Sequence, residues 1–196
     1  MYLHRRIGNI KFDLDGVLIN FAHVAKEVLK AEGYTVNPTT EFKWTTTPEL
    51  SNTQIWKRFK HAYTLWRITP IFDGAKELLR AVYDLTGKPI SIITARPTDY
   101  ATETFKVIER VTDVPFTVAI TEGSQKFAHL EPHDIIVEDR RRTVLKLAEI
   151  GIRSLLIDRK YNQIENPPPQ VERVGGLLEI EEMLPQLFDM SIERER

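Results

Sequence analysis

Five short apolar segments recur along this chain, and a stretch of helical character separates each pair. The segments cover residues 7–14, 90–94, 116–120, 134–138 and 153–158. Short apolar strands that alternate with helices are typical of an α/β fold, in which a parallel sheet carries helices on both faces. The sequence therefore predicts a Rossmann-like, doubly wound parallel sheet.

The helical stretches between these segments carry recognisable start and stop signals. Residues 75–85 follow a possible cap at Asp73-Gly74, residues 98–111 follow Pro97, and residues 143–149 end before Gly151. Prolines 167–169 predict a stiff, extended connector that leads to a last helix over 177–188. We assign residues 1–20 and 73–196 to one α/β core.

Residues 21–72 interrupt the alternation, because they show helical patterns over 21–32 and 49–66 but no clear strand. They hold nine of the 18 aromatic residues, and seven basic against four acidic side chains give them a net charge of +3. We predict a small, all-helical cap inserted after the first strand. Its aromatic rings suit either the cover of an anionic, ring-bearing ligand or the core of the cap itself, and the sequence leaves both open.

Composition excludes several classes of protein. The 196 residues include no cysteine, which excludes disulfides, thiolate zinc sites and cysteine nucleophiles. A net charge of −1 argues against a protein that coats nucleic acid or lies on a membrane surface. We see no signal-peptide pattern at the start and no apolar run near the ~20 residues that span a bilayer, so we expect a cytoplasmic protein.

The strongest chemical signal follows the first apolar segment, where Asp13 and Asp15 precede Gly16. Two residues apart on an extended chain, both carboxylates leave the same face. Such a pair can bind a hard cation such as Mg²⁺ and leave an oxygen free to attack. Aspartates at this spacing also occur in sugar-transferring enzymes and in turns, but the apolar strand before them and Val17-Leu18 after Gly16 make the pattern more specific.

This pattern resembles the first motif of the haloacid dehalogenase superfamily of phosphohydrolases, an apolar strand followed by Asp-x-Asp-Gly. Thr94, Lys126 and the pair Glu138-Asp139 match the three later motifs, in the same order. Singly, each has an ordinary alternative: Thr94 or Asp139 could cap a helix, Glu138 could be a strand-end charge, and Lys126 could be a solvated lysine. Jointly they favour one site, because the carboxyl ends of the strands in an open parallel sheet share a crevice.

The resemblance implies hydrolysis of phosphate monoesters through an aspartyl-phosphate. In this scheme Asp13 is the nucleophile, and Asp15 donates a proton to the leaving alkoxide and later takes one from water. Mg²⁺ is the implied cofactor, held by Asp13, the backbone carbonyl of Asp15, and Asp139. The family usually has two aspartates in its last motif, so the sequence leaves open whether Glu138 contacts the metal directly or through water. The implied phosphate-binding residues are Gly16, Thr94, Ala95 and Lys126.

Further details look most like the 5′(3′)-deoxyribonucleotidases and their bacterial and phage relatives, namely Asp-Gly-Val-Leu-Ile-Asn-Phe at 15–21, Ile-Thr-Ala-Arg-Pro at 93–97 and Asp-Arg-Lys-Tyr-Asn at 158–162. Phe21 matches the aromatic residue that packs against the substrate base in that family, although packing between cap and core explains it equally well. Trp44 and Trp56 are candidates for the rest of a base pocket. Arg140 stands at a helix start, where the dipole disfavours positive charge, so we expect it to face the phosphate crevice or an acidic neighbour.

Three classes of function follow. The sequence favours a nucleotidase that acts on nucleoside or deoxynucleoside monophosphates. A phosphatase of polynucleotide 3′ ends or of another small metabolite is the alternative, and a non-catalytic binding module is least favoured, because the residues of all four motifs are present. We expect a small phosphorylated substrate, with no membrane contact and no stable nucleic-acid partner, and we leave the oligomeric state open.

Overall fold

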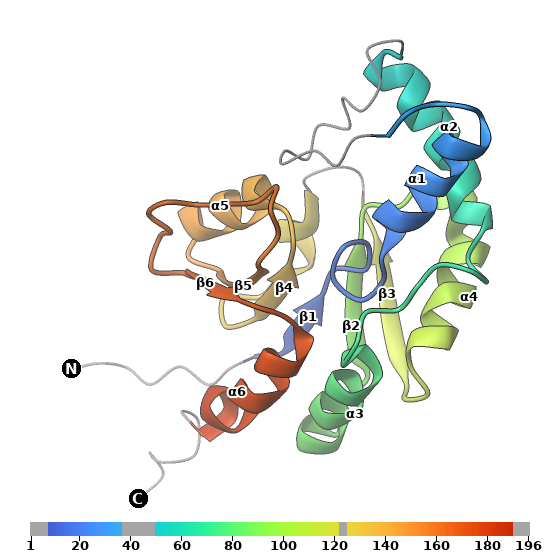
Figure 1. The fold of residues 1–196 in the computed structure, drawn as a ribbon. Coiled ribbons are helices and arrows are strands. Elements are labelled where there is room, and N and C mark those ends of the chain that lie inside the picture. Colours follow the sequence, from blue (N-terminus) through green and yellow to red (C-terminus); the bar gives the residue numbers. More distant parts are fainter. Residues whose placement is uncertain (1–7, 37–49, 122–124, 190–196) are drawn as a thin grey trace, which may run out of the picture.

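A computed structural model describes residues 8–36, 50–121 and 125–189 (Figure 1). Six strands form one sheet in the order β3-β2-β1-β4-β5-β6, and every neighbouring pair is parallel. This confirms the doubly wound α/β fold. The strands are β1 (Ile10–Phe12), β2 (Ile90–Thr94), β3 (Phe116–Ile120), β4 (Ile135–Glu138), β5 (Arg153–Ile157) and β6 (Val171–Val174).

The sequence analysis missed one strand. It predicts a connector between the prolines and the last helix, but β6 lies there and pairs with β5 at the edge of the sheet. The segment Val-Glu-Arg-Val has only two apolar residues, so the apolar pattern of a buried strand is absent. The first strand is also shorter than the predicted 7–14, because the chain leaves the sheet after Phe12 to turn at Gly16.

The described residues form six α-helices and two short 3₁₀ helices, η1 and η2. The predicted helix over 98–111 is divided into η1 and α4, and the other predicted helices agree with the structure to within a few residues. None of the helices in the described ranges is both long and apolar enough to cross a membrane. Their bounds are α1 (Phe21–Ala31), α2 (Asn52–Thr64), α3 (Ala75–Thr86), η1 (Thr98–Tyr100), α4 (Ala101–Val111), η2 (Gln125–His129), α5 (Arg141–Glu149) and α6 (Leu177–Asp189).

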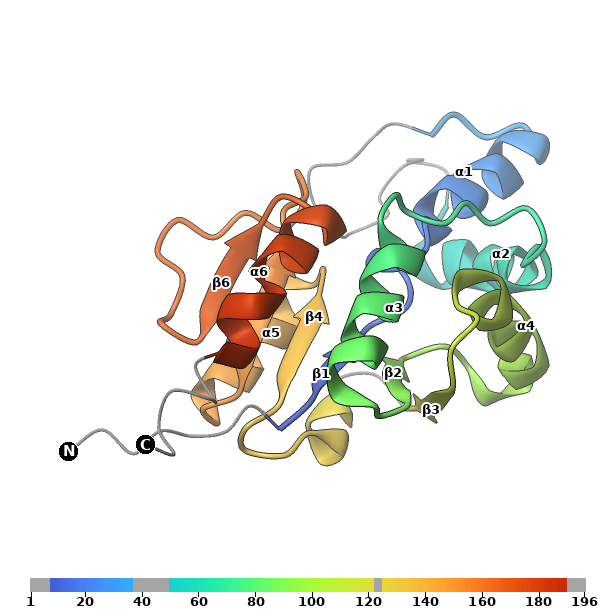
Figure 2. The ribbon, with the colours of Figure 1, turned by 90° about the horizontal axis from the view of Figure 1, so that it is seen from below.

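Both faces of the sheet are covered by helices, as alternate residues of the strands show. Ile135 and Val137 of β4 belong to the large core cluster that contains the buried faces of α3, α4 and α6, and α3 and α6 lie side by side (Figure 2). Ile136, between them, packs instead with Leu147 of α5 on the opposite face. The segment 135–137 is therefore buried on both faces of the sheet, which explains why it reads as a continuous apolar run.

Helices α1 and α2, which we call the cap helices, pack against each other and form a second core. Residues 21, 24, 25, 28 and 29 of α1 are buried at helical spacing. α2 begins with a capping box: the backbone N–H of Gln54 donates to the Ser51 hydroxyl, and the backbone N–H of Ser51 donates to the Gln54 side-chain oxygen. Phe59 is the centre of this cluster, with no exposed surface and edge-to-face contacts to Phe21 and Trp56. The division of the chain into a core and a cap over 21–72 remains a prediction.

We expect Phe59→Ala to lower the free energy of unfolding by about 3–5 kcal/mol, because it removes a fully buried ring and leaves a cavity between the cap helices. Urea denaturation followed by circular dichroism measures the change. Phe105→Ala is the matched control, since Phe105 is 44% exposed on α4 and should cost clearly less. Equal losses in the two variants would contradict a packed second core.

Candidate active site

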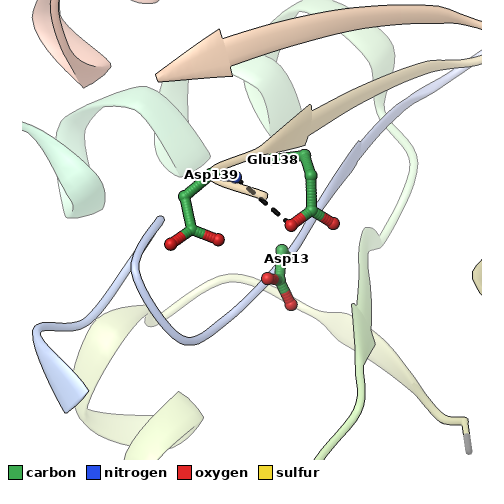
Figure 3. A group of neighbouring side chains, drawn as sticks. All are labelled: Asp13, Glu138 and Asp139. Carbon is green, nitrogen blue, oxygen red and sulfur yellow. Dashed lines mark hydrogen bonds between the residues drawn. The ribbon is translucent and has the colours of Figure 1, made fainter. Parts of the chain in front are cut away.

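The residues of the four sequence motifs come together at the carboxyl ends of the central strands. Asp13 follows β1, Thr94 ends β2, Glu138 ends β4, and Asp139 comes next in the chain, while Lys126 arrives from η2. All five side chains are buried. Figure 3 shows the carboxylates of Asp13, Glu138 and Asp139 gathered in one place, and one oxygen from each lies within 4.8 Å of the others.

Lys126 is the positive charge at the centre of this cluster. Its Nζ atom lies 2.6 Å from Asp13 Oδ1 and 2.8 Å from Glu138 Oε2, and its side chain is 2% exposed. Burial alone would lower the pKa of Lys126, but the two carboxylates outweigh burial and raise it. Lys126 is therefore a charged, buried partner of Asp13, and the alternative of a solvated surface lysine is excluded.

Glu138 already has hydrogen-bond partners at both oxygens. Oε2 accepts from Lys126, and Oε1 accepts from the backbone N–H groups of Asp139 and Arg140 at 3.3 and 3.1 Å. Burial would raise the pKa of Glu138, but Lys126 lowers it below the ordinary value and the charge of Arg140 adds to this. Arg140 thus contacts Glu138 through its backbone N–H group, and the predicted role of its guanidinium group remains a prediction.

The positive charge of Lys126 does not offset burial and the negative charge of Glu138 at Asp13 and Asp139. Burial raises the pKa of Asp13 well above its usual range, and the charge of Glu138 adds to this against the effect of Lys126. Burial and Glu138 likewise raise the pKa of Asp139 to about 7. Asp139 Oδ1 is buried and has no hydrogen-bond partner among the described residues. A divalent cation would neutralise these carboxylates and occupy that oxygen, so the donor set fits a hard metal ion.

The turn after β1 brings the backbone against Asp139. Gly16 has φ of 88°, a left-handed conformation that favours glycine. A Cβ atom at this position would lie 2.1 Å from Asp139 Oδ2, so a larger residue has no room. The glycine of the first motif is therefore required by both conformation and space.

The loop after β5 supports Asp139 from the other side, and the sequence analysis assigned none of its residues a role. Tyr161 donates a hydrogen bond from its hydroxyl to Asp139 Oδ2. Asn162, which is buried, donates from Nδ2 to the backbone oxygen of Asp139 at 2.7 Å, and Arg159 donates to the backbone oxygen of Gly16 at 3.1 Å. Their position after a strand end is the signal that could have identified them.

Asp15 forms a two-pronged ion pair that the sequence did not predict. Arg96 Nε lies 2.9 Å from Asp15 Oδ2, and Arg96 Nη2 lies 2.8 Å from Asp15 Oδ1. The Arg96 side chain is 1% exposed and that of Asp15 is 24% exposed. Arg96 comes two residues after Thr94, at the end of β2, and this position is again the signal available in the sequence.

Two capping alternatives are excluded by the observed helix starts. The Thr94 hydroxyl accepts the N–H of Arg96 at 3.3 Å, while η1 begins after Pro97 with no side-chain cap. Helix α5 begins after Arg140, again with no side-chain cap, so Asp139 does not cap it. Ala95 is partly buried in the turn between Thr94 and Arg96.

The aromatic candidates are less closely tied to the acidic cluster. Phe21 is 7% exposed, and its ring stacks on that of Tyr63 with centroids 4.8 Å apart. Trp56 is 46% exposed and contacts Phe59 of its own helix. Trp44 lies outside the described residues. The structure thus places Phe21 within the cap helices' own core, and its contact with a substrate remains a prediction.

Comparisons with known proteins identify the fold. No family model matches the sequence, and no curated protein matches it. A haloacid dehalogenase-like hydrolase from Streptococcus pneumoniae aligns with a TM-score of 0.61 and 21% identity, over 91% of this chain and 98% of that one. A haloacid dehalogenase-like hydrolase from Xanthomonas campestris aligns with a TM-score of 0.59 and 12% identity, over 97% of this chain and 100% of that one. β-Phosphoglucomutase from Clostridium difficile aligns with a TM-score of 0.58 and 14% identity, over 96% of this chain and 100% of that one. At these identities the likeness shows a shared fold, that of haloacid dehalogenase-like hydrolases.

The raised pKa of Asp139 makes stability depend on pH in a definite direction. Its pKa is about 7 in the folded chain and near ~4 when unfolded, so the folded state binds the proton more tightly. In metal-free buffer this contribution to stability is complete below pH 4 and is lost as the pH rises to 7. We expect Asp139→Asn to be more stable than wild type at pH 8, by on the order of 2–4 kcal/mol.

This advantage should shrink toward pH 4, where Asp139 of the wild type is protonated in the folded state and about half protonated in the unfolded state. Urea denaturation between pH 4 and 8, with a chelator present, measures it. A variant that is less stable than wild type at pH 8 would show that the Asp139 charge is compensated by contacts within the chain.

Proposed function

We propose that this protein is a Mg²⁺-dependent phosphatase of small phosphate monoesters that works through an aspartyl-phosphate. The observation that carries this proposal is the buried cluster of Asp13, Glu138 and Asp139 around Lys126, at the carboxyl edge of the sheet. A chain has no packing reason to bury three carboxylates against one lysine, because burying charge costs free energy unless it is paired. A divalent cation would complete the pairing and leave the site able to accept the phosphate group of a substrate.

Asp13, Asp139 and the backbone carbonyl of Asp15 would hold the metal. The unpartnered Asp139 Oδ1 supports a direct contact. Glu138, by contrast, already bonds Lys126 and two backbone N–H groups, which favours contact with the metal through water. When bound, Mg²⁺ supplies positive charge that offsets the repulsion between the carboxylates and the phosphate.

The residues of the chain then have separate tasks in two steps. An Asp13 oxygen attacks phosphorus, the bond between phosphorus and the leaving oxygen breaks, and Asp15 gives that oxygen a proton. Water then attacks the aspartyl-phosphate, gives its proton to Asp15 and releases phosphate. The Thr94 hydroxyl, the Lys126 ammonium and the backbone N–H group of Ala95 would hold the phosphate oxygens through the transfer. The N–H group of Gly16 already donates to the backbone oxygen of Ile19 at 2.9 Å, so Gly16 would serve the phosphate site through its turn and not as a donor.

We propose a nucleoside or deoxynucleoside monophosphate as the substrate. The aromatic and basic character of residues 21–72 supports this, together with the motif resemblance to deoxyribonucleotidases, and Phe21, Trp44, Trp56 and Arg140 are the residues we assign to specificity. A second candidate is another small phosphorylated metabolite, because the ring of Phe21 is largely used in stacking on Tyr63. A neighbour in fold, β-phosphoglucomutase, is named for a phosphorylated sugar.

Release of inorganic phosphate from a panel of esters tests the function and separates these candidates. The panel contains 5′- and 3′-nucleotides, sugar phosphates and 3′-phosphorylated oligonucleotides, each with and without Mg²⁺. Preference for mononucleotides supports the nucleotidase, and preference for oligonucleotide ends supports a polynucleotide phosphatase. No release from any ester would overturn the proposed reaction.

Asp13→Asn should abolish phosphate release while the protein stays folded, because the amide is a far weaker nucleophile than the carboxylate. Phosphate release with the best substrate of the panel and the circular dichroism spectrum of the variant check this. Asp158→Asn, at an exposed position after β5, is the matched control and should keep wild-type activity. Near-wild-type turnover by Asp13→Asn would remove Asp13 from the role of nucleophile.

Addition of MgCl₂ to the metal-free protein should raise the melting temperature, because an ion that binds only the folded state stabilises it, by about 2.7 kcal/mol at 100 times its Kd. Differential scanning calorimetry measures the shift against NaCl of equal ionic strength. Asp158→Asn should keep the shift and Asp139→Asn should lose it. An equal shift in both variants would place the metal elsewhere.

A further inference from the structure

Arg96 connects the end of β2 with the cap helices. On one side its guanidinium pairs with both oxygens of Asp15 at 2.8 and 2.9 Å. On the other side it lies over two aromatic rings, 4.9 Å from the centroid of Tyr63 on α2 and 5.6 Å from that of Phe21 on α1. A single buried side chain therefore contacts the first motif and both cap helices.

The contact with Asp15 fixes the direction of that carboxylate. The guanidinium is a rigid, planar fork, so two parallel hydrogen bonds hold the carboxylate in one plane and at one distance. Each carboxylate oxygen has a second lone pair that remains open after it has accepted one bond from Arg96. Asp15 also keeps 24% of its side-chain surface exposed. It is thus held by Arg96 and still accessible to a substrate.

The contact with the rings fixes Arg96 in turn. Phe21 and Tyr63 stack on each other with an angle of 17° between their planes, and both belong to the core of the cap helices. A cation over an aromatic face is attracted by the ring, and more strongly when water is excluded. Because Arg96 is almost completely buried, its position depends on the packing of these two rings.

The guanidinium group of Arg96 is not fully hydrogen-bonded, so hydrogen bonding alone does not explain why Arg96 is buried here. Nη1 is buried and has no hydrogen-bond partner among the described residues. A buried donor without a partner lowers the stability of the fold, and an arginine with a purely structural role would be expected to have a partner for each buried N–H group. The unpartnered nitrogen belongs to Arg96, whose other two nitrogens pair with Asp15.

We propose that Arg96 is a positioning residue for the proposed reaction: it holds Asp15 in the place from which the proton reaches the leaving oxygen, and it makes that place depend on the packing of Phe21 and Tyr63. The inference rests on the proposed function. It concerns Asp15 as the proton donor to the leaving oxygen, because the later attack of water on the aspartyl-phosphate, which also uses Asp15, is the same for every substrate. Binding of the phosphate and attack by Asp13 do not need the Arg96–Asp15 pair.

This restriction gives the inference a distinct experimental signature. A sugar alkoxide is a poor leaving group and needs a proton, whereas p-nitrophenolate leaves without one. Loss of a positioned acid should therefore slow the hydrolysis of an alkyl phosphate far more than that of p-nitrophenyl phosphate, since such catalysis contributes about 10²–10⁴ in rate. A variant that merely loosened the fold would slow both.

The experiment compares kcat and KM of Arg96→Lys with wild type on both substrates, the alkyl phosphate being the best nucleotide of the panel. Lysine keeps the charge but cannot form the two-pronged pair. We expect kcat for the nucleotide to fall at least 100-fold, kcat for p-nitrophenyl phosphate to fall less than tenfold, and KM to change little. Arg58→Lys is the matched control, because Arg58 also pairs with a carboxylate (Glu32) and lies over a ring (Tyr34), away from Asp15. It should behave as wild type.

Substitutions of Tyr63 test the link between Arg96 and the cap helices. They also test the inference if Arg96→Lys does not fold. Tyr63→Phe retains the ring under Arg96 and should keep the wild-type ratio of the two kcat values. Tyr63→Leu removes the ring and should lower kcat for the nucleotide several-fold more than kcat for p-nitrophenyl phosphate.

Each outcome decides the matter. If kcat falls by the same factor on both substrates, in Arg96→Lys or in Tyr63→Leu, the substituted residue has only a structural role. That result would overturn the inference while the proposed function stands. An unchanged kcat for the nucleotide in Arg96→Lys would do the same. If wild type releases phosphate from neither substrate, the proposed function fails and this inference fails with it.

Discussion

Repulsion among three buried carboxylates is the constraint on which the site depends. Asp13, Glu138 and Asp139 are brought within 4.8 Å by the ends of two adjacent strands, and the ammonium of Lys126 contacts two of them. The protein keeps the arrangement because a large hydrophobic core holds the strands in register beneath it. Burial, with the charge of Glu138 added to it, raises the pKa of Asp13 and Asp139.

The strand order explains why residues distant in sequence meet. β1 is central, with β2 on one side and β4 on the other, so the turns after these three strands are neighbours at one edge of the sheet. The first turn carries Asp13 and Asp15, the second carries Thr94 and Arg96, and the third carries Asp139. The loop after β5 lies next to the third turn and completes the support of Asp139 through Tyr161 and Asn162. The site is therefore assembled by topology, and the individual turns need only the right residue at each strand end.

Sequence reasoning succeeded where a pattern has one physical meaning. Five strands read as largely apolar runs, and residues at the ends of the central ones could be assigned to one crevice. It failed for β6, an edge strand whose two central residues are charged. It also assigned no role to Arg96 or Tyr161, because their positions after strand ends do not show which carboxylate each side chain will contact. Such pairs join positions 81 and 22 residues apart and exist only once the strands are in place.

The sequence by itself determined the fold class and the identity of the four motifs, since strand periodicity and residue type at strand ends are local properties of the chain. Only the tertiary structure decided what each charged group does. It paired Lys126 with both Asp13 and Glu138, left an oxygen of Asp139 without a partner, and placed Arg96 between Asp15 and the rings of the cap helices. The physical reason is that pairing, burial and pKa depend on distances between side chains, and the chain sets these distances only when the sheet and the helices have packed.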